Sequence, residues 1–307
     1  QITDVKNWLD KLTELKARKD TILNALEKQE KLTPELKARI ESSWDSNEIE
    51  DIYLPYKPKR VTRAEMARKR GLEPLAKLIA AQKEPFLSGR VPAFVQGEVK
   101  DEEEALSGAR DIIAEWVNEN ERTRNQVRFA FRQAVILAKV IKGKEEEGAK
   151  YRNYFQFEEK LSRCQSHRLL AVRRGEEEGF LRVSIAPADD DACLESLYRQ
   201  YKRNNGACWE QFQLAIDDAY KRLLKPSIES EFAKSSKLKA DEEAIRVFAD
   251  NLRQLLLAPP LGQKRVLGID PGYRTGCKVV CLDAQGNLLH NETIYPHPPK
   301  NERKKAE

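Results

Sequence analysis

A single carboxylate, Asp270, occupies the position in this chain that is best suited to chemistry. It follows the apolar run 266–269 and precedes Pro271 and Gly272, and a second β-type run, 277–282, comes directly afterwards. An acid at the end of a strand can hold a divalent cation, and a glycine turn beside it can approach a phosphate. Asp-Pro-Gly is also common in plain turns between strands. The pattern therefore leaves two interpretations open, a metal or phosphate site and a simple turn.

The densest group of basic residues lies between positions 57 and 70, where Glu65 is the only acidic residue. The group comprises Lys57, Lys59, Arg60, Arg63, Arg68, Lys69 and Arg70. Pro55 and Pro58 forbid a helix through residues 54–60, so we expect an extended strap there. A helix should then begin at Thr62, with Glu65 completing a capping box, and end at Gly71. Clustered lysines and arginines bind nucleic-acid phosphates, but they also form solvated helix faces, and both interpretations stay open.

Three further groups are better explained by structure than by chemistry. Cys164 and His167 have a ligand-like spacing, but no second pair completes a zinc site. The acidic triplet at 189–191 suits the N-terminus of a helix without any ion. Arginines recur along a predicted helix over residues 122–141, where salt bridges to neighbours are the more frequent outcome; these are Arg122, Arg124, Arg128 and Arg132.

Composition limits the class of protein. Charged residues make up 34% of the 307 positions and hydrophobic residues 40%, which favours a helical protein with much surface over a disordered one. The net charge of +5 permits contact with nucleic acid, since opposite charges are interspersed. No apolar run approaches the roughly 20 residues of a membrane span, so we expect no membrane partner. Five scattered cysteines indicate free thiols and a cytoplasmic location.

Helical periodicity dominates the chain as far as Pro259 and Pro260, where strand-like runs take over. One β-hairpin is expected near 169–186, in which residues 180–185 alternate and pair with residues 169–173. We therefore predict three parts. They are an N-terminal helical region with the basic Pro-rich strap over 1–84, a central helical region with the hairpin over 85–262, and a strand-rich part over 263–307.

Several short motifs, taken in order along the chain, resemble those of the bacterial transcription accessory protein Tex family. They are Asp-Ile-Tyr-Leu-Pro-Tyr-Lys-Pro-Lys-Arg at 51–60, and the segments at 71–76, 166–171, 218–224 and 251–257. The stretch around Asp270 resembles the start of that family's YqgF domain, an RNase H-like module. The resemblance implies a mainly α protein: a multi-helix scaffold with one small β element, followed by the first strands of an RNase H-like α/β domain. By this comparison the family's helix-hairpin-helix part and S1 domain are not in the chain.

The resemblance also implies a function. It indicates a transcription accessory factor associated with RNA or DNA and with the transcription machinery, in which this segment is a helical scaffold that positions nucleic-acid-binding modules. One alternative is a metal-dependent RNase H-like nuclease, with Mg²⁺ at Asp270 in a complete domain. A third is an actin-like ATPase that uses residues 268–276 on phosphates. Because two-metal cleavage needs several carboxylates, we expect no catalysis and no cofactor in this chain alone.

Overall fold

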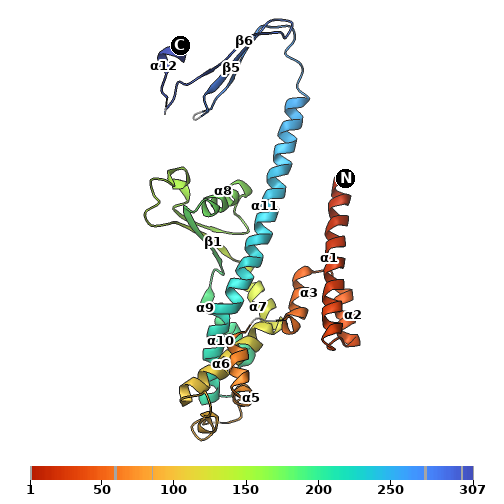
Figure 1. The fold of residues 1–307 in the computed structure, drawn as a ribbon, viewed down its shortest axis with the longest axis vertical. Helices are drawn as coiled ribbons and strands as arrows, with labels where there is room; N and C mark the ends of the chain where they lie inside the picture. Colours follow the sequence, from red (N-terminus) through yellow and green to blue (C-terminus); the bar gives the residue numbers. More distant parts are fainter. Residues whose placement is uncertain (1, 59–60, 85, 273–274, 299, 307) are drawn as a thin grey trace. The chain divides into compact units, whose positions relative to one another are not determined.

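We describe the fold from a computed structural model that covers residues 2–58, 61–84, 86–272, 275–298 and 300–306 (Figure 1). The chain forms two compact units, Gln1–Ala244 and Ile245–Glu307. It is mainly α-helical with two three-stranded antiparallel sheets, which confirms the predicted fold class. None of the helices formed by the described residues combines the length and the apolar character that are needed to cross a membrane.

Three N-terminal helices pack around an apolar cluster of their own. They are α1 (Ile2–Lys28), α2 (Pro34–Ser42) and α3 (Ser46–Tyr53), and the cluster includes Ile22, Leu26, Ile40 and Ile49. The helix starts follow from local chemistry, since the Thr33 hydroxyl accepts a hydrogen bond from the Leu36 amide at 3.2 Å. A 3₁₀ turn, Leu54–Tyr56, follows α3, so the predicted strap is not extended at its start.

A second, larger core begins at Ala64 and ends at Ala240. Its first helices are α4 (Arg63–Lys69), α5 (Glu73–Ala81), α6 (Glu102–Glu119) and α7 (Glu121–Phe131). Two 3₁₀ segments, Val91–Phe94 and Ala149–Tyr154, lie in the connections. The later helices are α9 (Asp190–Tyr201), α10 (Ala207–Asp218) and α11 (Lys225–Leu256), with a π-helical stretch, Ala219–Leu224, between the last two.

Helix α9 begins at the acidic triplet. The Asp189 carboxylate accepts a hydrogen bond from the Ala192 amide at 2.8 Å. Asp190 accepts one from the hydroxyl of buried Tyr220 at 2.5 Å and forms an ion pair with Lys225. The triplet is therefore a cap and a packing element of this helix, as expected from the helix dipole.

The first sheet has the strand order β2-β1-β3, formed by β1 (Val135–Val140), β2 (Gln156–Lys160) and β3 (Leu181–Ala186). The predicted hairpin within 169–186 is wrong in its first half. Residues 169–173 belong to helix α8 (Ser166–Glu177), whose Leu169 and Val172 are buried in the core, and β3 pairs with β1 instead. The helix predicted over 122–141 is also wrong beyond Phe131, because burial alternates with period two along β1.

The register of this sheet separates two faces. Ile136, Ala138 and Ile185 are buried on the face toward the core. The opposite face, which we call the open sheet face, is partly or fully exposed at every position. In its three cross-strand rows, Lys160, Val135 and Ala186 are aligned, as are Glu158, Leu137 and Ser184, and Gln156, Lys139 and Arg182.

The second unit contains the predicted three-stranded meander. Its strands are β4 (Val266–Asp270), β5 (Cys277–Leu282) and β6 (Leu288–Ile294), in the order β4-β5-β6, and a short helix, α12 (Arg303–Ala306), follows. The β5–β6 turn is closed by Asp283, whose carboxylate accepts hydrogen bonds from the amides of Gln285 at 2.9 Å and Asn287 at 2.8 Å. These bonds, with one from the Asn287 side chain as the largest effect, lower the pKa of Asp283.

A test of the first sheet's packing uses Gly175, where α8 approaches β3. A Cβ atom there would lie 2.6 Å from Leu181 Cδ1 and 3.3 Å from Tyr151 Cδ1. We expect Gly175→Val to lower the free energy of unfolding by about 1–3 kcal/mol, because the added methyl groups overpack the core. Urea denaturation measures this change. Gly89→Val is the matched control, since a Cβ at Gly89 has nothing within 4 Å; equal losses for the two variants would contradict the packing described here.

Candidate functional site

The basic segment over 57–70 is the first candidate site, and α4 carries most of it. The Thr62 hydroxyl accepts a hydrogen bond from the Glu65 amide at 3.1 Å, which confirms the predicted helix start. Arg68 forms an ion pair with Glu115 at 2.6 Å, and Arg70 forms one with Glu104 at 2.9 Å. Lys69 lies 3.6 Å from Glu65. Three of the seven predicted phosphate-binding cations therefore already have carboxylate partners.

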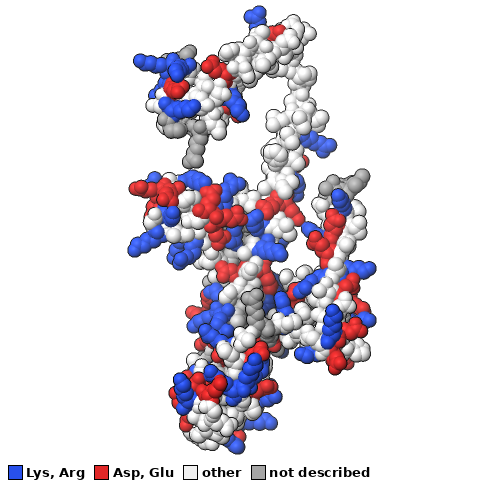
Figure 2. Space-filling view, in the orientation of Figure 1, with Lys and Arg blue, Asp and Glu red and all other residues white. Residues whose placement is uncertain are grey.

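The remaining positive charge of this segment is smaller than the sequence suggests. Lys57 and Arg63 are exposed, and neither has an ion pair among the residues that the structure describes. Lys59 and Arg60 lie outside the described residues. A shallow hollow of about 720 Å³ borders the helix end; its lining includes Lys69, Arg70 and Glu98. Figure 2 shows basic and acidic side chains interspersed, as the ion pairs require.

Asp270, the second candidate, stands at the end of β4. Its side chain is 77% exposed and lies 4.0 Å from the ammonium group of Lys278 on β5. Across the described ranges, no group of three or more His, Cys, Asp or Glu side chains is arranged to hold a metal ion. One exposed carboxylate beside a lysine does not fit a divalent cation, which needs several oxygen ligands. The described residues thus supply one potential ligand and do not form a complete metal site.

Cys164 is partly buried beside Glu159, in surroundings that favour the neutral thiol. Burial, with a smaller contribution from Glu159, raises the pKa of its thiol to about 11. The described residues bring no further His, Cys, Asp or Glu ligands together with Cys164 and His167 into a metal-binding group.

A buried ion cluster, formed by Asp51, Arg124, Arg128 and Glu231, was missed by the sequence analysis. Asp51 Oδ1 accepts from Arg124 Nε at 2.6 Å and from Arg128 Nη2 at 2.9 Å. Glu231 accepts from Arg124 Nη2 at 2.8 Å and from Arg128 Nε at 2.7 Å. The Asp51 and Arg124 side chains are only 5% and 6% exposed. The cluster joins α3, α7 and α11 within the first unit.

The cluster is electrically balanced, with two guanidinium groups and two carboxylates. Burial acts to lower the pKa of Arg128, but its hydrogen bonds to Asp51 and Glu231 outweigh this effect and raise it. Arg124 also donates to the Ser227 hydroxyl at 3.1 Å. Nearly all of the guanidinium N–H groups that point into the protein therefore have an acceptor. This is the condition for burying charges without a large cost in free energy. The cluster connects three helices, and its charged groups are paired with one another rather than available for a chemical reaction.

The sequence indicates that two members of this cluster lie together, but it does not indicate their partners. Arg124 and Arg128 are four residues apart, so they lie on one face of α7. Asp51 opens the motif at 51–60, and Glu231 lies in the first turns of α11. The partners are separated by 73 and 107 positions, and local patterns do not report such pairings.

Comparisons with known proteins assign this architecture. Residues 88–248 match the family model described as Tex central region-like, and residues 264–307 match that of the Tex protein YqgF-like domain. The chain is thus a protein with a Tex-type helical central region and a YqgF-like segment. It is 36% identical to the transcriptional accessory protein Tex of Neisseria gonorrhoeae over 98% of its length, and 38% identical to protein tex of Bordetella pertussis over 92%. The chain belongs to the Tex family.

Similarity extends to a eukaryotic protein. The human S1 RNA-binding domain-containing protein 1 is 26% identical over 96% of the chain. The chain spans 41% of the length of the gonococcal relative, 38% of the Bordetella relative and 31% of the human one. These relatives therefore contain large parts that lie outside the compared region.

The ion cluster gives a direct test of how the N-terminal helices are held. We expect Asp51→Asn to lower the free energy of unfolding by about 3–5 kcal/mol, because two buried arginines lose their shared carboxylate. Chemical denaturation of the purified chain measures the loss. Glu50→Gln is the neighbouring control; it breaks a 2.5 Å pair with Arg18 in which both side chains are more than a third exposed, so we expect about 1 kcal/mol or less. A loss at Asp51 no larger than that at Glu50 would contradict the role of the cluster.

Proposed function

We propose that this chain is the helical scaffold of a nucleic-acid-associated transcription accessory factor that acts in the cytoplasm with the transcription machinery. The observation that carries the proposal is the continuous core from Ala64 to Ala240, which coincides with the Tex central region over 88–248. The names of two relatives supply the biological context, one a transcriptional accessory protein and the other an S1 RNA-binding domain-containing protein.

A scaffold role is supported by how the helices are joined. The N-terminal helices have their own apolar cluster, separate from the large core. Ion pairs connect the two: besides the buried cluster, Arg39 contacts Glu121 at 2.6 Å and Lys11 contacts Glu242 at 3.1 Å. The exposed pairs contribute little free energy, but the largely buried cluster restricts the orientation of the packed helices, because separating them would leave an unpaired ion. A scaffold that positions binding modules needs such fixed orientations.

We expect the chain to bind nucleic acid without cleaving it. Anisotropy of labelled single-stranded RNA and of duplex DNA should rise with the chain at low salt, and affinity should fall steeply as salt is added, because binding releases counterions from phosphates. Incubation with Mg²⁺ should leave both substrates intact. Metal-dependent cleavage that is lost in Asp270→Asn would overturn the scaffold proposal in favour of a nuclease, and absence of binding at low salt would overturn the association of this segment with nucleic acid.

The basic segment makes a separate prediction. Lys57→Glu combined with Arg63→Glu should weaken nucleic-acid binding with little change in Tm, because neither side chain has an ion pair among the described residues. Extending the reversal to Lys59 and Arg60 should weaken binding further. The control, Lys83→Glu with Lys234→Glu, changes the net charge equally at exposed positions elsewhere. If the segment variant and the control bind equally well, the segment has a structural role only.

A further inference from the structure

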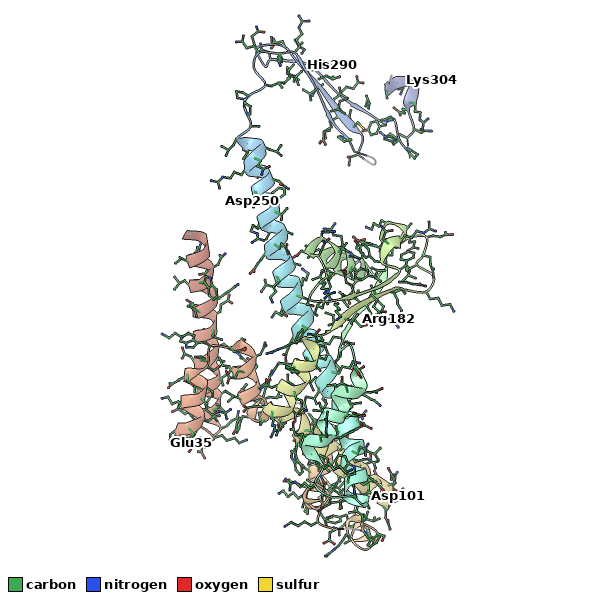
Figure 3. The ribbon with its side chains drawn as sticks, turned by 180° about the vertical axis from the view of Figure 1, so that it is seen from behind. Glu35, Asp101, Arg182, Asp250, His290 and Lys304 are labelled. Carbon is green, nitrogen blue, oxygen red and sulfur yellow. The ribbon has the colours of Figure 1, made fainter. Side chains whose placement is uncertain are left out.

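Two cations face each other across the open sheet face. Lys139 on β1 is directly opposite Arg182 on β3, and both are exposed. Figure 3 labels Arg182 on this sheet. Neighbouring strands lie about 4.8 Å apart, and like charges placed directly opposite each other destabilise a sheet. The pairing therefore works against folding unless an anion occupies the space above it.

No carboxylate relieves this repulsion within the described residues. Lys139, Arg182 and Lys160, the third cation of the face, form no ion pair there, whereas four of the other eight lysines and arginines between positions 139 and 182 do. Lys150 is bound to Glu178 at 2.5 Å, for example, and Arg173 to Glu176 at 2.7 Å. Glu158 is the one acidic residue in the three rows of the face. The face thus keeps three unpaired cations in a part of the chain where carboxylates are plentiful.

A groove of about 600 Å³ lies beside these cations. Its lining includes Leu137, Lys139, Gln156 and Glu158, which belong to the open sheet face. Every described residue of the lining comes from β1, β2 or the position before β2, and α8, which packs on the other side, contributes none. The groove therefore borders the exposed side chains of Lys139, Gln156 and Glu158, and its lining also includes Ala138 and Phe157 of the buried face.

The groove favours a nucleotide over an acidic peptide. Glu158 repels carboxylates and phosphates alike, but it can accept a hydrogen bond from the exocyclic amino group of a base, a donor that the side chains of an acidic peptide lack. The Gln156 amide can both donate to and accept from a base edge. Bases within a duplex are stacked and paired and cannot enter such a groove, but those of a single strand can be splayed out.

We propose that the open sheet face binds single-stranded nucleic acid, with Lys139, Arg182 and Lys160 on the phosphates and the β1–β2 groove receiving a base. The inference rests on the proposed association with nucleic acid and gives it a location. It also differs from the basic segment over 57–70, where Arg68, Lys69 and Arg70 already have carboxylate partners.

The experiment compares Lys139→Glu with Arg182→Glu against the matched control Lys83→Glu with Lys234→Glu in the complete 307-residue chain. Anisotropy with labelled single-stranded RNA is recorded over a series of salt concentrations. We expect the sheet-face variant to bind about tenfold more weakly, and the slope of log K against log salt to become shallower by about 1.4, since two phosphate contacts are lost. The control should bind like the wild-type chain.

A milder variant separates binding from folding. In Lys139→Gln with Arg182→Gln the mutual repulsion is gone, so Tm should be equal to or higher than that of the wild-type chain while RNA binding weakens. A lower Tm with unchanged binding would mean that the two cations support the fold, and would overturn the proposal.

Two further comparisons show whether the location, the proposed function or the choice of ligand is wrong. If the wild-type chain binds RNA and both sheet-face variants bind it equally well, the location is wrong but the proposed function stands. If the wild-type chain binds no nucleic acid at low salt, the proposed function fails, and this inference fails with it. Competition by polyglutamate as effective as that by unlabelled single-stranded RNA would show that the face prefers an acidic protein, which also overturns the inference.

Discussion

The first unit depends on four charges, two of them buried and two partly buried, that must remain together. Asp51, Arg124, Arg128 and Glu231 come from three helices, and none of them could be buried alone at an acceptable cost in free energy. Arginine suits this role because its planar fork serves two carboxylates at once, where a lysine would present a point charge. The cluster therefore constrains the positions of α3, α7 and α11 simultaneously, and a shift of any one helix would leave an unpaired ion.

The same balance of charge explains why basic residues in this chain are a poor guide to a binding surface. In a sequence with 55 basic and 50 acidic residues, many cations find a carboxylate nearby after folding, and some of these carboxylates are distant in sequence. The basic segment over 57–70 is dense in sequence, yet Arg68 and Arg70 are neutralised by Glu115 and Glu104, which lie far along the chain. Lys139 and Arg182 are isolated in sequence and become neighbours only through strand pairing. Free positive charge is thus a property of the fold.

Local patterns predicted the parts of the fold that depend on local chemistry. Thr62 caps a helix as expected, and the β4–β6 meander follows from three apolar runs separated by turn residues. Strand β1 was predicted as a continuation of α7, because the apolar residues at 127, 131, 135, 136 and 140 recur at helical spacing. The prediction of a hairpin within 169–186 was wrong because it, too, used only local spacing. The alternation in β3 was detected, but its partner lies about forty residues upstream, and the pairing is decided by tertiary packing.

Helix α11 shows how one element can meet several constraints of this kind. Its Glu231 completes the buried ion cluster, while Glu229, two residues earlier, accepts a hydrogen bond from the Ile185 amide at 2.7 Å. The second contact occupies a donor of β3, which would otherwise be an unprotected sheet edge. The first turns of α11 therefore contact both the N-terminal helices, through Glu231, and the first sheet, through Glu229. The sheet is hydrogen-bonded to α11 at its β3 edge and packs against α8 on one face, while its opposite face stays exposed, so the helix that contributes Glu231 to the ion cluster also contacts this sheet.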